Sequence, residues 1–392
     1  MLSQYQHGFR KNHSTNTNLI YFWDEISSLA NIGKEISIIY TDLRKAFDSV
    51  PHDLLVLKLE AHGIMGRNIR WLQNYLSYRH QSVIVNGKSS QPILIESGVP
   101  QGGVLSGLLF NIYINDMPSK FEYARTYLYA DDAKIYAPIP DSESIVKVQK
   151  DLDSLATWCA KWRLRLNEQK CFIINYVPQG RSSTPACFSI NNVPLEIRQQ
   201  AMDLGIVITD DLKFHNQVLK ACKKATQEIN RIRRTFTSRN PSFLRNMFTM
   251  FVRPHLEYCV QVWNPEYLGD TSRKEKVQNR FTRLLRHGNV MSPKERNEVL
   301  GITTHEIRRL RGDLIYIYKM FTSGLFISSN VTQTRGHSKK LCLERTNNNI
   351  RKHSFSVRNI LAWNNLHEHV VQSTNLNIFK VRLDDYLKNF TL

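Results

Sequence analysis

The sequence predicts an α+β protein in two unlike halves, a mixed helix and strand region followed by a mainly helical, basic region. Three observations support this fold class. Glu35–Thr41 is an almost wholly apolar run, as expected for a strand buried inside a sheet. Short strand patterns alternate with amphipathic helical patterns up to about residue 178. Beyond the polar linker 179–185, the pattern becomes helical and basic from Phe214 onward.

The elements of the first half follow from local signals. Asn18–Ala30 reads as an amphipathic helix that Ser14 or Thr15 could cap. Asn86-Gly87 is a strong hairpin signal between two strand patterns, 81–86 and 92–97. The remaining expected elements are helices over 52–62, 67–78, 104–115 and 141–162, and short strands over 164–167 and 171–177.

The second half is expected to begin with a few short strands and then to continue as helices. The strand patterns cover 187–190, 195–198 and 204–209, a polar loop covers 332–349, and a last helical segment runs from about Phe355 to Phe390. A chain of 392 residues has room for two or three domains. We expect the divisions 1–180, 181–300 and 301–392, the last of unassigned role.

Composition excludes several classes of protein. No apolar run approaches the roughly 18 residues of a membrane-spanning helix, so no membrane partner is expected. The first residues lack the charged and apolar regions of a secretory signal. Six scattered cysteines with no C-x-x-C pair favour a reducing compartment and no structural zinc. We expect an intracellular protein of nucleus and cytoplasm.

The positive charge is concentrated in the second half. Residues 1–180 carry 19 Lys and Arg against 17 Asp and Glu, whereas residues 181–392 carry 34 against 17. Such asymmetry usually means that one half meets a polyanion. The basic residues recur on successive predicted helices, which favours a surface that follows phosphates over a merely solvated face.

Asp131 and Asp132 stand at the centre of an apolar hairpin pattern, Tyr127–Tyr129 before them and Ala133–Tyr136 after them. A short strand, an Ala-Asp-Asp turn and a second strand is the natural interpretation. Two charges in such surroundings are costly unless water, a partner or a cation compensates them. An ordinary acidic turn is the simpler alternative, because Asp favours turns.

Two further features favour a functional site over a simple turn. Asp42 ends the buried strand, where a carboxylate is poorly solvated unless a site needs it. The glycine-rich loop Ser97–Gly103 precedes a helix and could approach a ligand closely. Three carboxylates from two strand ends suit Mg²⁺, and two such ions support phosphoryl transfer. Asp48 is better explained as a cap of the following helix.

Four segments in this order resemble the motifs of reverse transcriptases, and more narrowly those of non-LTR, LINE-like retrotransposons of the jockey and CR1 type. They are Asp42–His52, Ser97–Gly102, Phe110–Asp116 and Tyr129–Asp132, supported by Gln6–Arg10 with Ser14-Thr15, and by Val252–Tyr258 with Trp263. The resemblance implies a right-hand polymerase with partial fingers and palm over 1–180, a thumb-like basic helical region over 181–300, and a C-terminal helical region.

The resemblance also implies an activity, an RNA-directed DNA polymerase that extends a primer 3′-OH on an RNA template. The implied partners are the RNA template, a DNA primer or target and deoxynucleoside triphosphates, with two Mg²⁺ ions for which Mn²⁺ could substitute. The implied site residues are Asp42, Asp131 and Asp132 as metal ligands, Lys170 as proton donor to pyrophosphate, Phe47 as the gate against ribose, Gln101 and Gly102 over the incoming nucleotide, and Arg10 near the template or triphosphate.

The chain departs from the family pattern in two places. Gly103-Val104-Leu105-Ser106-Gly107 stands where the family usually has Ser-Val-Leu-Gly-Pro. The chain also begins in mid-fingers, so we expect an N-terminally truncated copy with weak or absent polymerase activity. A nucleic-acid-binding protein that no longer catalyses is the alternative, and an RNA-dependent RNA polymerase is disfavoured by Phe47.

Overall fold

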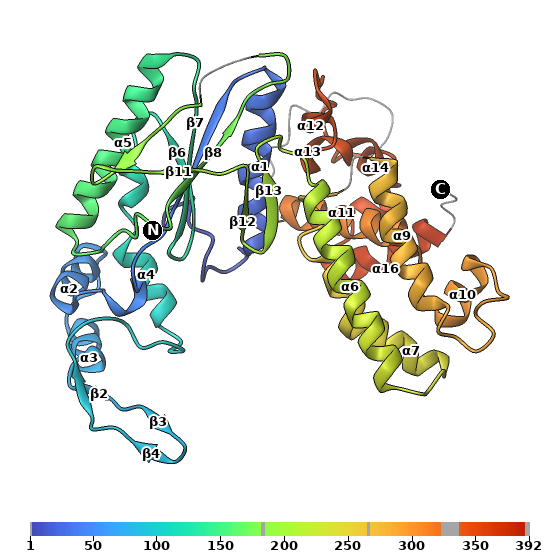
Figure 1. Ribbon diagram of the computed structural model, residues 1–392, viewed down its shortest axis with the longest axis horizontal. Helices are drawn as coiled ribbons and strands as arrows, with labels where there is room; N and C mark the ends of the chain where they lie inside the picture. Colours follow the sequence, from blue (N-terminus) through green and yellow to red (C-terminus); the bar gives the residue numbers. More distant parts are fainter. Residues whose placement is uncertain (1, 182–184, 265–266, 323–336, 389–392) are drawn as a thin grey trace. The chain divides into compact units, whose positions relative to one another are not determined.

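The computed structural model describes residues 2–181, 185–264, 267–322 and 337–388. Parts of the predicted linker and of the polar loop 332–349 therefore lie outside the described residues. The chain forms two compact units (Figure 1), one built from residues 1–22 and 33–199 and the other from residues 23–32 and 200–392. Helix α1 (Thr15–Asn31) contributes residues to both.

A five-stranded sheet in the order β11-β8-β1-β7-β6 forms the centre of the first unit. The predicted buried strand is confirmed as β1 (Ile36–Thr41), which pairs antiparallel with β7 (Asp132–Pro138) on one side and β8 (Phe172–Tyr176) on the other. Strand β6 (Arg125–Tyr129) completes the hairpin with β7, and β11 (Glu196–Ile197) adds a parallel edge. Ile38 and Ile39 of β1 are fully buried, which explains its apolar sequence.

Helices pack around this sheet and share its hydrophobic core. They are α2 (His52–Ala61), α3 (Arg67–Leu76), α4 (Ser106–Tyr113) and α5 (Ser142–Lys161), with 3₁₀ turns at Ala46–Asp48 and Met117–Lys120. Each helix predicted in this half is present, with ends shifted by a few residues. Asp141 caps α5, because its side chain accepts a hydrogen bond from the Ser144 amide.

The predicted hairpin around Asn86-Gly87 is confirmed, and it contains two successive pairs of short strands. Strands β3 (Ile84–Val85) and β4 (Lys88–Ser89) pair around the turn, and β2 (Arg79–Gln81) pairs with β5 (Ile93–Ile95) at the base. Figure 1 shows this ribbon extending away from α3 and the sheet. Ser97 and the glycine-rich loop follow it directly.

The second unit is mainly helical after one short hairpin. The sequence patterns predicted only the second strand of that hairpin, β13 (Ile206–Thr209), and missed its partner β12 (Gln200–Asp203). The predicted strands at 187–190 and 195–198 belong to the first unit and are shorter, as β9 (Ser189–Ile190) and β11, with β10 (Val193–Pro194) beside β9. The helices that follow are α6 (His215–Thr235), α7 (Pro241–Met247), a π-helical turn Phe248–Val252, α8 (Arg253–Glu257), α9 (Leu268–Thr282), α10 (Pro293–Leu300) and α11 (His305–Thr322).

The last helical segment, predicted over 355–390, is helical in its described part but is divided into four helices. They are α13 (Phe355–Arg358), α14 (Ile360–Asn364), α15 (Glu368–Val371) and α16 (Leu376–Lys388), preceded by α12 (Asn349–Lys352). One of the breaks falls at a polar residue whose side chain satisfies backbone amides. Asn375 Oδ1 accepts hydrogen bonds from the amides of Asn377 and Ile378 at the start of α16.

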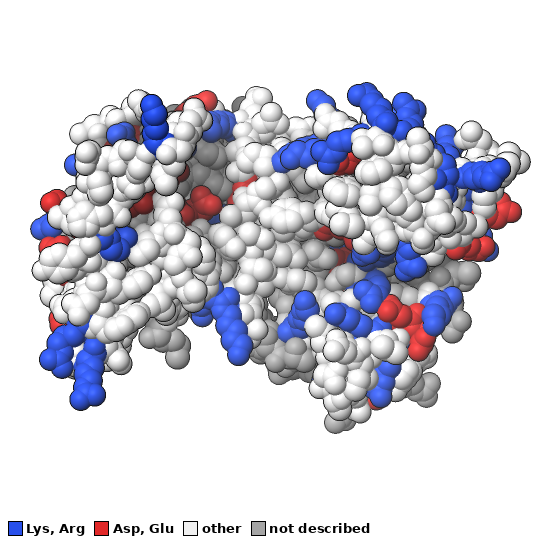
Figure 2. Space-filling view, turned by 90° about the horizontal axis from the view of Figure 1, so that it is seen from below, with Lys and Arg blue, Asp and Glu red and all other residues white. Residues whose placement is uncertain are grey.

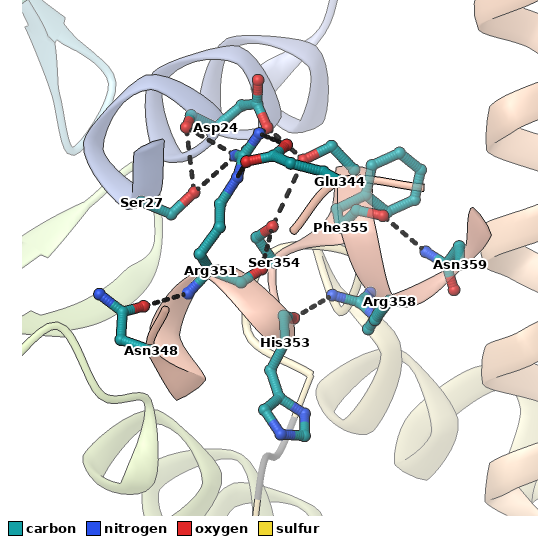
Figure 3. Close-up of polar contacts among 11 residues, drawn as sticks. Asp24, Ser27, Glu344, Asn348, Arg351, His353, Ser354, Phe355, Arg358 and Asn359 are labelled. Carbon is teal, nitrogen blue, oxygen red and sulfur yellow. Dashed lines mark hydrogen bonds and ion pairs between the residues drawn. The ribbon is translucent and has the colours of Figure 1, made fainter. Parts of the chain in front are cut away.

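An ion-pair cluster ties this C-terminal region to the second half of α1 (Figure 3). The buried Arg351 guanidinium donates to Asp24 Oδ1 and to Glu344 Oε2, both at 2.6 Å, and to Ser27 Oγ at 3.0 Å. All four residues lie in the second unit, so the cluster joins two parts of that unit. No helix in the described ranges is both long and apolar enough to cross a membrane.

Candidate active site

Asp42 lies where β1 leaves the sheet. The register pairs Thr41 with Ala133, so Asp42 follows at the end where β7 begins. Its Oδ2 accepts a hydrogen bond from Asn167 Nδ2 at 3.1 Å and lies 3.5 Å from Lys170 Nζ. The Asn167 amide also donates to the Asp42 carbonyl at 2.8 Å. The segment before β8 therefore holds Asp42 in place and brings an ammonium group to its carboxylate.

The Asp131-Asp132 pair occupies the predicted hairpin, but the turn is shorter than expected. Tyr129 pairs with Asp132, which leaves Ala130 and Asp131 as the turn and makes Asp132 the first residue of β7. Asp131 is half-buried and Asp132 is exposed. Burial, with the negative charge of Asp42 as a further cause, raises the pKa of the Asp131 carboxyl. Asp42 and Asp131 are thus close enough to repel.

This arrangement fits a divalent cation. A cation between the two carboxylates would offset the burial and the repulsion from Asp42, which both raise the pKa of Asp131. Carboxylate oxygen is the donor that Mg²⁺ prefers. Within the described ranges, no three His, Cys, Asp or Glu side chains are grouped so that they could hold a metal ion. Mg²⁺ is typically held by one or two carboxylates with water and substrate phosphates. The Asp42 and Asp131 pair meets that requirement. Asp132 is the first residue of β7 and is exposed to solvent.

The glycine-rich loop packs against the 3₁₀ turn that follows Asp42. Gly98 has φ 86°, and an added Cβ would lie 2.7 Å from the Asp48 Cα, so the close approach requires glycine. Gln101 Nε2 donates to Asp48 Oδ1 at 2.9 Å. The interpretation of Asp48 as a helix cap is wrong, because Pro51 occupies the N-cap of α2. Gly102 is exposed, with φ 80°.

Phe47 lies in the same 3₁₀ turn, between two other aromatic rings. Its ring stacks on the buried Phe110 at a centroid distance of 4.5 Å and meets Phe9 edge-on at 6.0 Å. Phe47 is half-buried, and its carbonyl accepts the Val99 amide at 2.8 Å. These contacts fix the ring beside the glycine-rich loop.

Arg10 contacts the N-terminal segment rather than the carboxylates or the glycine-rich loop. Its guanidinium donates to the carbonyl oxygens of Ser3 and Gln6, and burial lowers its pKa. It therefore braces the N-terminal segment in this structure. Its expected role near template or triphosphate stays a prediction.

Sequence reasoning missed two residues that support the carboxylates. Asn167 holds Asp42, and the buried Gln6 holds the Ala130 backbone. Gln6 belongs to a motif that resembles the family, but nothing in its own sequence surroundings indicates a partner 124 residues away.

The comparisons with known proteins decide the family. Residues 1–237 match the family described as reverse transcriptase (RNA-dependent DNA polymerase). The chain belongs to the reverse transcriptase family. As a family, reverse transcriptases use divalent metal ions.

The curated reverse transcriptases that it resembles come from non-LTR retrotransposons, which confirms the narrower resemblance. The chain is 28% identical over 302 residues to the probable RNA-directed DNA polymerase from transposon BS of Drosophila melanogaster, covering 73% of this chain and 33% of that protein. It is 26% identical over 278 residues to the RNA-directed DNA polymerase from mobile element jockey of Drosophila funebris, covering 67% and 30%. The chain thus spans about a third of these relatives.

Among solved structures, the chain overlaps with a Candida tropicalis telomerase solved with a fragment of telomeric RNA. The TM-score is 0.45 at 12% identity, and the overlap covers 99% of this chain and 54% of that one.

Proposed function

We propose that this chain catalyses RNA-directed DNA synthesis for a non-LTR retroelement, extending a DNA primer 3′-OH on an RNA template. The observation that carries the proposal is that Asp42, 3.5 Å from Lys170 Nζ, ends β1 beside the hairpin that carries Asp131, in a chain of the reverse transcriptase family. Residues 1–180 would serve as partial fingers and palm, residues 181–300 as a thumb, and residues 301–392 as a C-terminal helical region of unassigned role.

Asp42 and Asp131 would hold two Mg²⁺ ions, with Asp132 as a further ligand. When bound, such ions lower the pKa of the attacking hydroxyl and stabilise charge on the leaving oxygen. The Lys170 ammonium, 3.5 Å from Asp42 Oδ2, is exposed and could give a proton to departing pyrophosphate. Mn²⁺ could replace Mg²⁺ because both accept carboxylate and phosphate oxygens.

Phe47 and the glycine-rich loop would select and position the incoming deoxynucleotide. The Phe47 ring, fixed between Phe9 and Phe110, would exclude a ribose 2′-OH by its bulk. Gln101 and Gly102 would lie against the nucleotide and template base, and the bond from Gln101 to Asp48 fixes the loop to the 3₁₀ turn that carries Phe47.

The basic residues of the second unit would contact nucleic-acid phosphates. Figure 2 shows Lys and Arg side chains spread over the visible face, with carboxylates among them. On α6, the exposed basic residues include Lys223, Lys224, Arg231, Arg233 and Arg234. Phosphate contacts of this kind supply affinity that falls steeply as salt rises.

Primer extension tests the proposal. A DNA primer annealed to RNA, with deoxynucleoside triphosphates and Mg²⁺, is compared for the wild type, Asp131→Asn and Glu143→Gln. Glu143 is an exposed carboxylate on α5 and serves as the matched control. We expect weak extension by the wild type and by Glu143→Gln, in line with the expectation from the sequence, and a loss of at least about 100-fold in Asp131→Asn, the scale of removing one electrostatic contact to the transition state. Salt-sensitive binding without extension would favour the non-catalytic alternative.

A further inference from the structure

The N-terminal segment runs beside the hairpin that carries the Asp131 turn. Gln6 and Leu128 form a parallel bridge, in which the His7 amide donates to the Leu128 carbonyl and the Leu128 amide donates to the Tyr5 carbonyl, both at 2.9 Å. Asn18 Nδ2 of α1 also donates to the Leu128 carbonyl, at 3.0 Å. The segment is therefore fixed along β6 up to the last residues before the turn.

The Gln6 side chain reaches past β6 to the turn itself. Its Oε1 accepts hydrogen bonds from the Ala130 amide at 2.9 Å and from the Gly8 amide at 2.8 Å, and its Nε2 donates to the Ala130 carbonyl at 3.2 Å. One side chain thus satisfies both backbone groups of Ala130. Gln6 is 2% exposed, so water cannot replace these bonds without opening the structure.

Ala130 needs such support because of its backbone conformation. Its φ is 54°, in the left-handed region that residues with a Cβ rarely adopt, at a cost of about 1 kcal/mol or more. Gly8 packs so closely that a Cβ there would overlap the Ala130 amide nitrogen, and Asn111 Nδ2 anchors the Gly8 carbonyl at 2.7 Å. The segment Gln6–Gly8, which Asn111 anchors, therefore packs directly against the residue before Asp131.

We propose that Gln6 is a positioning residue, which holds the Ala130-Asp131 turn in the strained conformation that presents the Asp131 carboxylate to the metal ions. The inference rests on the proposed function for the identity of the metal site. Gln6 itself is buried behind the turn, and it acts through the Ala130 backbone. A relaxed turn would move Asp131 relative to Asp42, and both carboxylates are needed to hold the cation.

A second substitution, Ala130→Gly, should compensate for the loss of Gln6 if Gln6 acts by holding the turn. Glycine adopts φ near 54° without the penalty that alanine pays. Ala130→Gly should therefore let the turn keep its shape without the Gln6 bonds. If Gln6 only anchored the N-terminal segment, a change at Ala130 would not compensate for its loss.

The test measures binding of Mn²⁺ alone, by electron paramagnetic resonance of the free ion, to the full chain. The variants are Gln6→Met, Ala130→Gly, the double variant and the exposed control Gln4→Met, with Asp131→Asn to define the site. We expect Gln6→Met to raise the Mn²⁺ Kd at least about tenfold, equal to about 1.4 kcal/mol. The double variant should recover most of that loss, and Gln4→Met and Ala130→Gly alone should match the wild type. An unchanged Kd in Gln6→Met, or no recovery in the double variant, would overturn the proposal.

Hydrogen exchange separates this inference from the proposed function. Without metal, the Ala130 amide should exchange faster in Gln6→Met than in the wild type, and its protection should stay unchanged in Gln4→Met. Equal protection in Gln6→Met would overturn the role of Gln6 in holding the turn. If the wild type and Asp131→Asn bind Mn²⁺ equally, the proposed metal site fails, and the presentation of Asp131 to metal fails with it. Faster exchange would then support only the contact between Gln6 and the turn.

Discussion

Replacing Arg351 by Met should destabilise the second unit through a defined loss of ion pairs. The Arg351 side chain is 7% exposed and joins Asp24 to Glu344 (Figure 3), whose side chains are each 39% exposed. Removing one partner of a buried pair costs about 3–5 kcal/mol, because the other charges stay behind without compensation. Here the carboxylates keep part of their hydration, so we expect a loss of about 2–3 kcal/mol in unfolding free energy.

Urea unfolding of the full chain, followed by circular dichroism, measures this loss. Arg345→Met is the matched control, because Arg345 is exposed and lies in the same segment. Arg351→Lys should be intermediate, since one ammonium keeps the charge but cannot bind two carboxylates as the guanidinium does. Hydrogen exchange at residues 24–31 and 349–352 should also quicken in Arg351→Met. A loss below about 0.5 kcal/mol would refute the view that this cluster secures the C-terminal region to α1.

Three further predictions concern the first unit. Phe47→Ala should raise incorporation of ribonucleotides relative to deoxynucleotides at least about tenfold in primer extension, and an unchanged ratio would exclude the gate. Lys170→Met should slow single-turnover extension by about 100-fold or more, the scale of general acid catalysis, and an unchanged rate would exclude that role. Burial lowers the pKa of His7 to about 3, whereas the pKa of His7 in the unfolded chain is near 6.5. As pH falls, the unfolded chain therefore binds the proton first and becomes more favourable relative to the folded chain. From pH 6.5 to pH 5, His7 should therefore lower the unfolding free energy by about 1.6 kcal/mol. In urea titrations His7→Gln should remove that contribution and leave the one from His305, whose pKa is also lowered by burial.

Local signals account for the parts of the fold that the sequence predicted. The buried strand at 36–41, the Asn86-Gly87 hairpin and the helix over 142–161 each depend on residues close together in the chain. The division of the last helical segment into several helices was not predicted. At the start of α16 the Asn375 side chain accepts hydrogen bonds from backbone amides, and the sequence pattern did not indicate that break.

The sequence predicted the carboxylates of the site but not the residues that hold them in position. Asp42 and Asp131 stand out because charge at the end of an apolar strand pattern is costly. The bonds from Asn167 to Asp42 and from Gln101 to Asp48 join residues 125 and 53 positions apart. Such contacts arise from the tertiary fold, and asparagine or glutamine at those positions has many other common uses. The strained φ of Ala130 was equally hidden, because alanine gives no sign of a left-handed turn.

The central claim is that Asp42 and Asp131 form one cation site, and a double-variant cycle tests it most directly. The Mn²⁺ Kd is measured for Asp42→Asn, Asp131→Asn and the two changes combined, with Glu143→Gln as control. If both carboxylates hold the same ion, each single change should weaken binding about tenfold or more, and the combined loss in free energy should differ from the sum of the single losses. Single variants that bind Mn²⁺ as the wild type does, or losses that simply add, would contradict the claim.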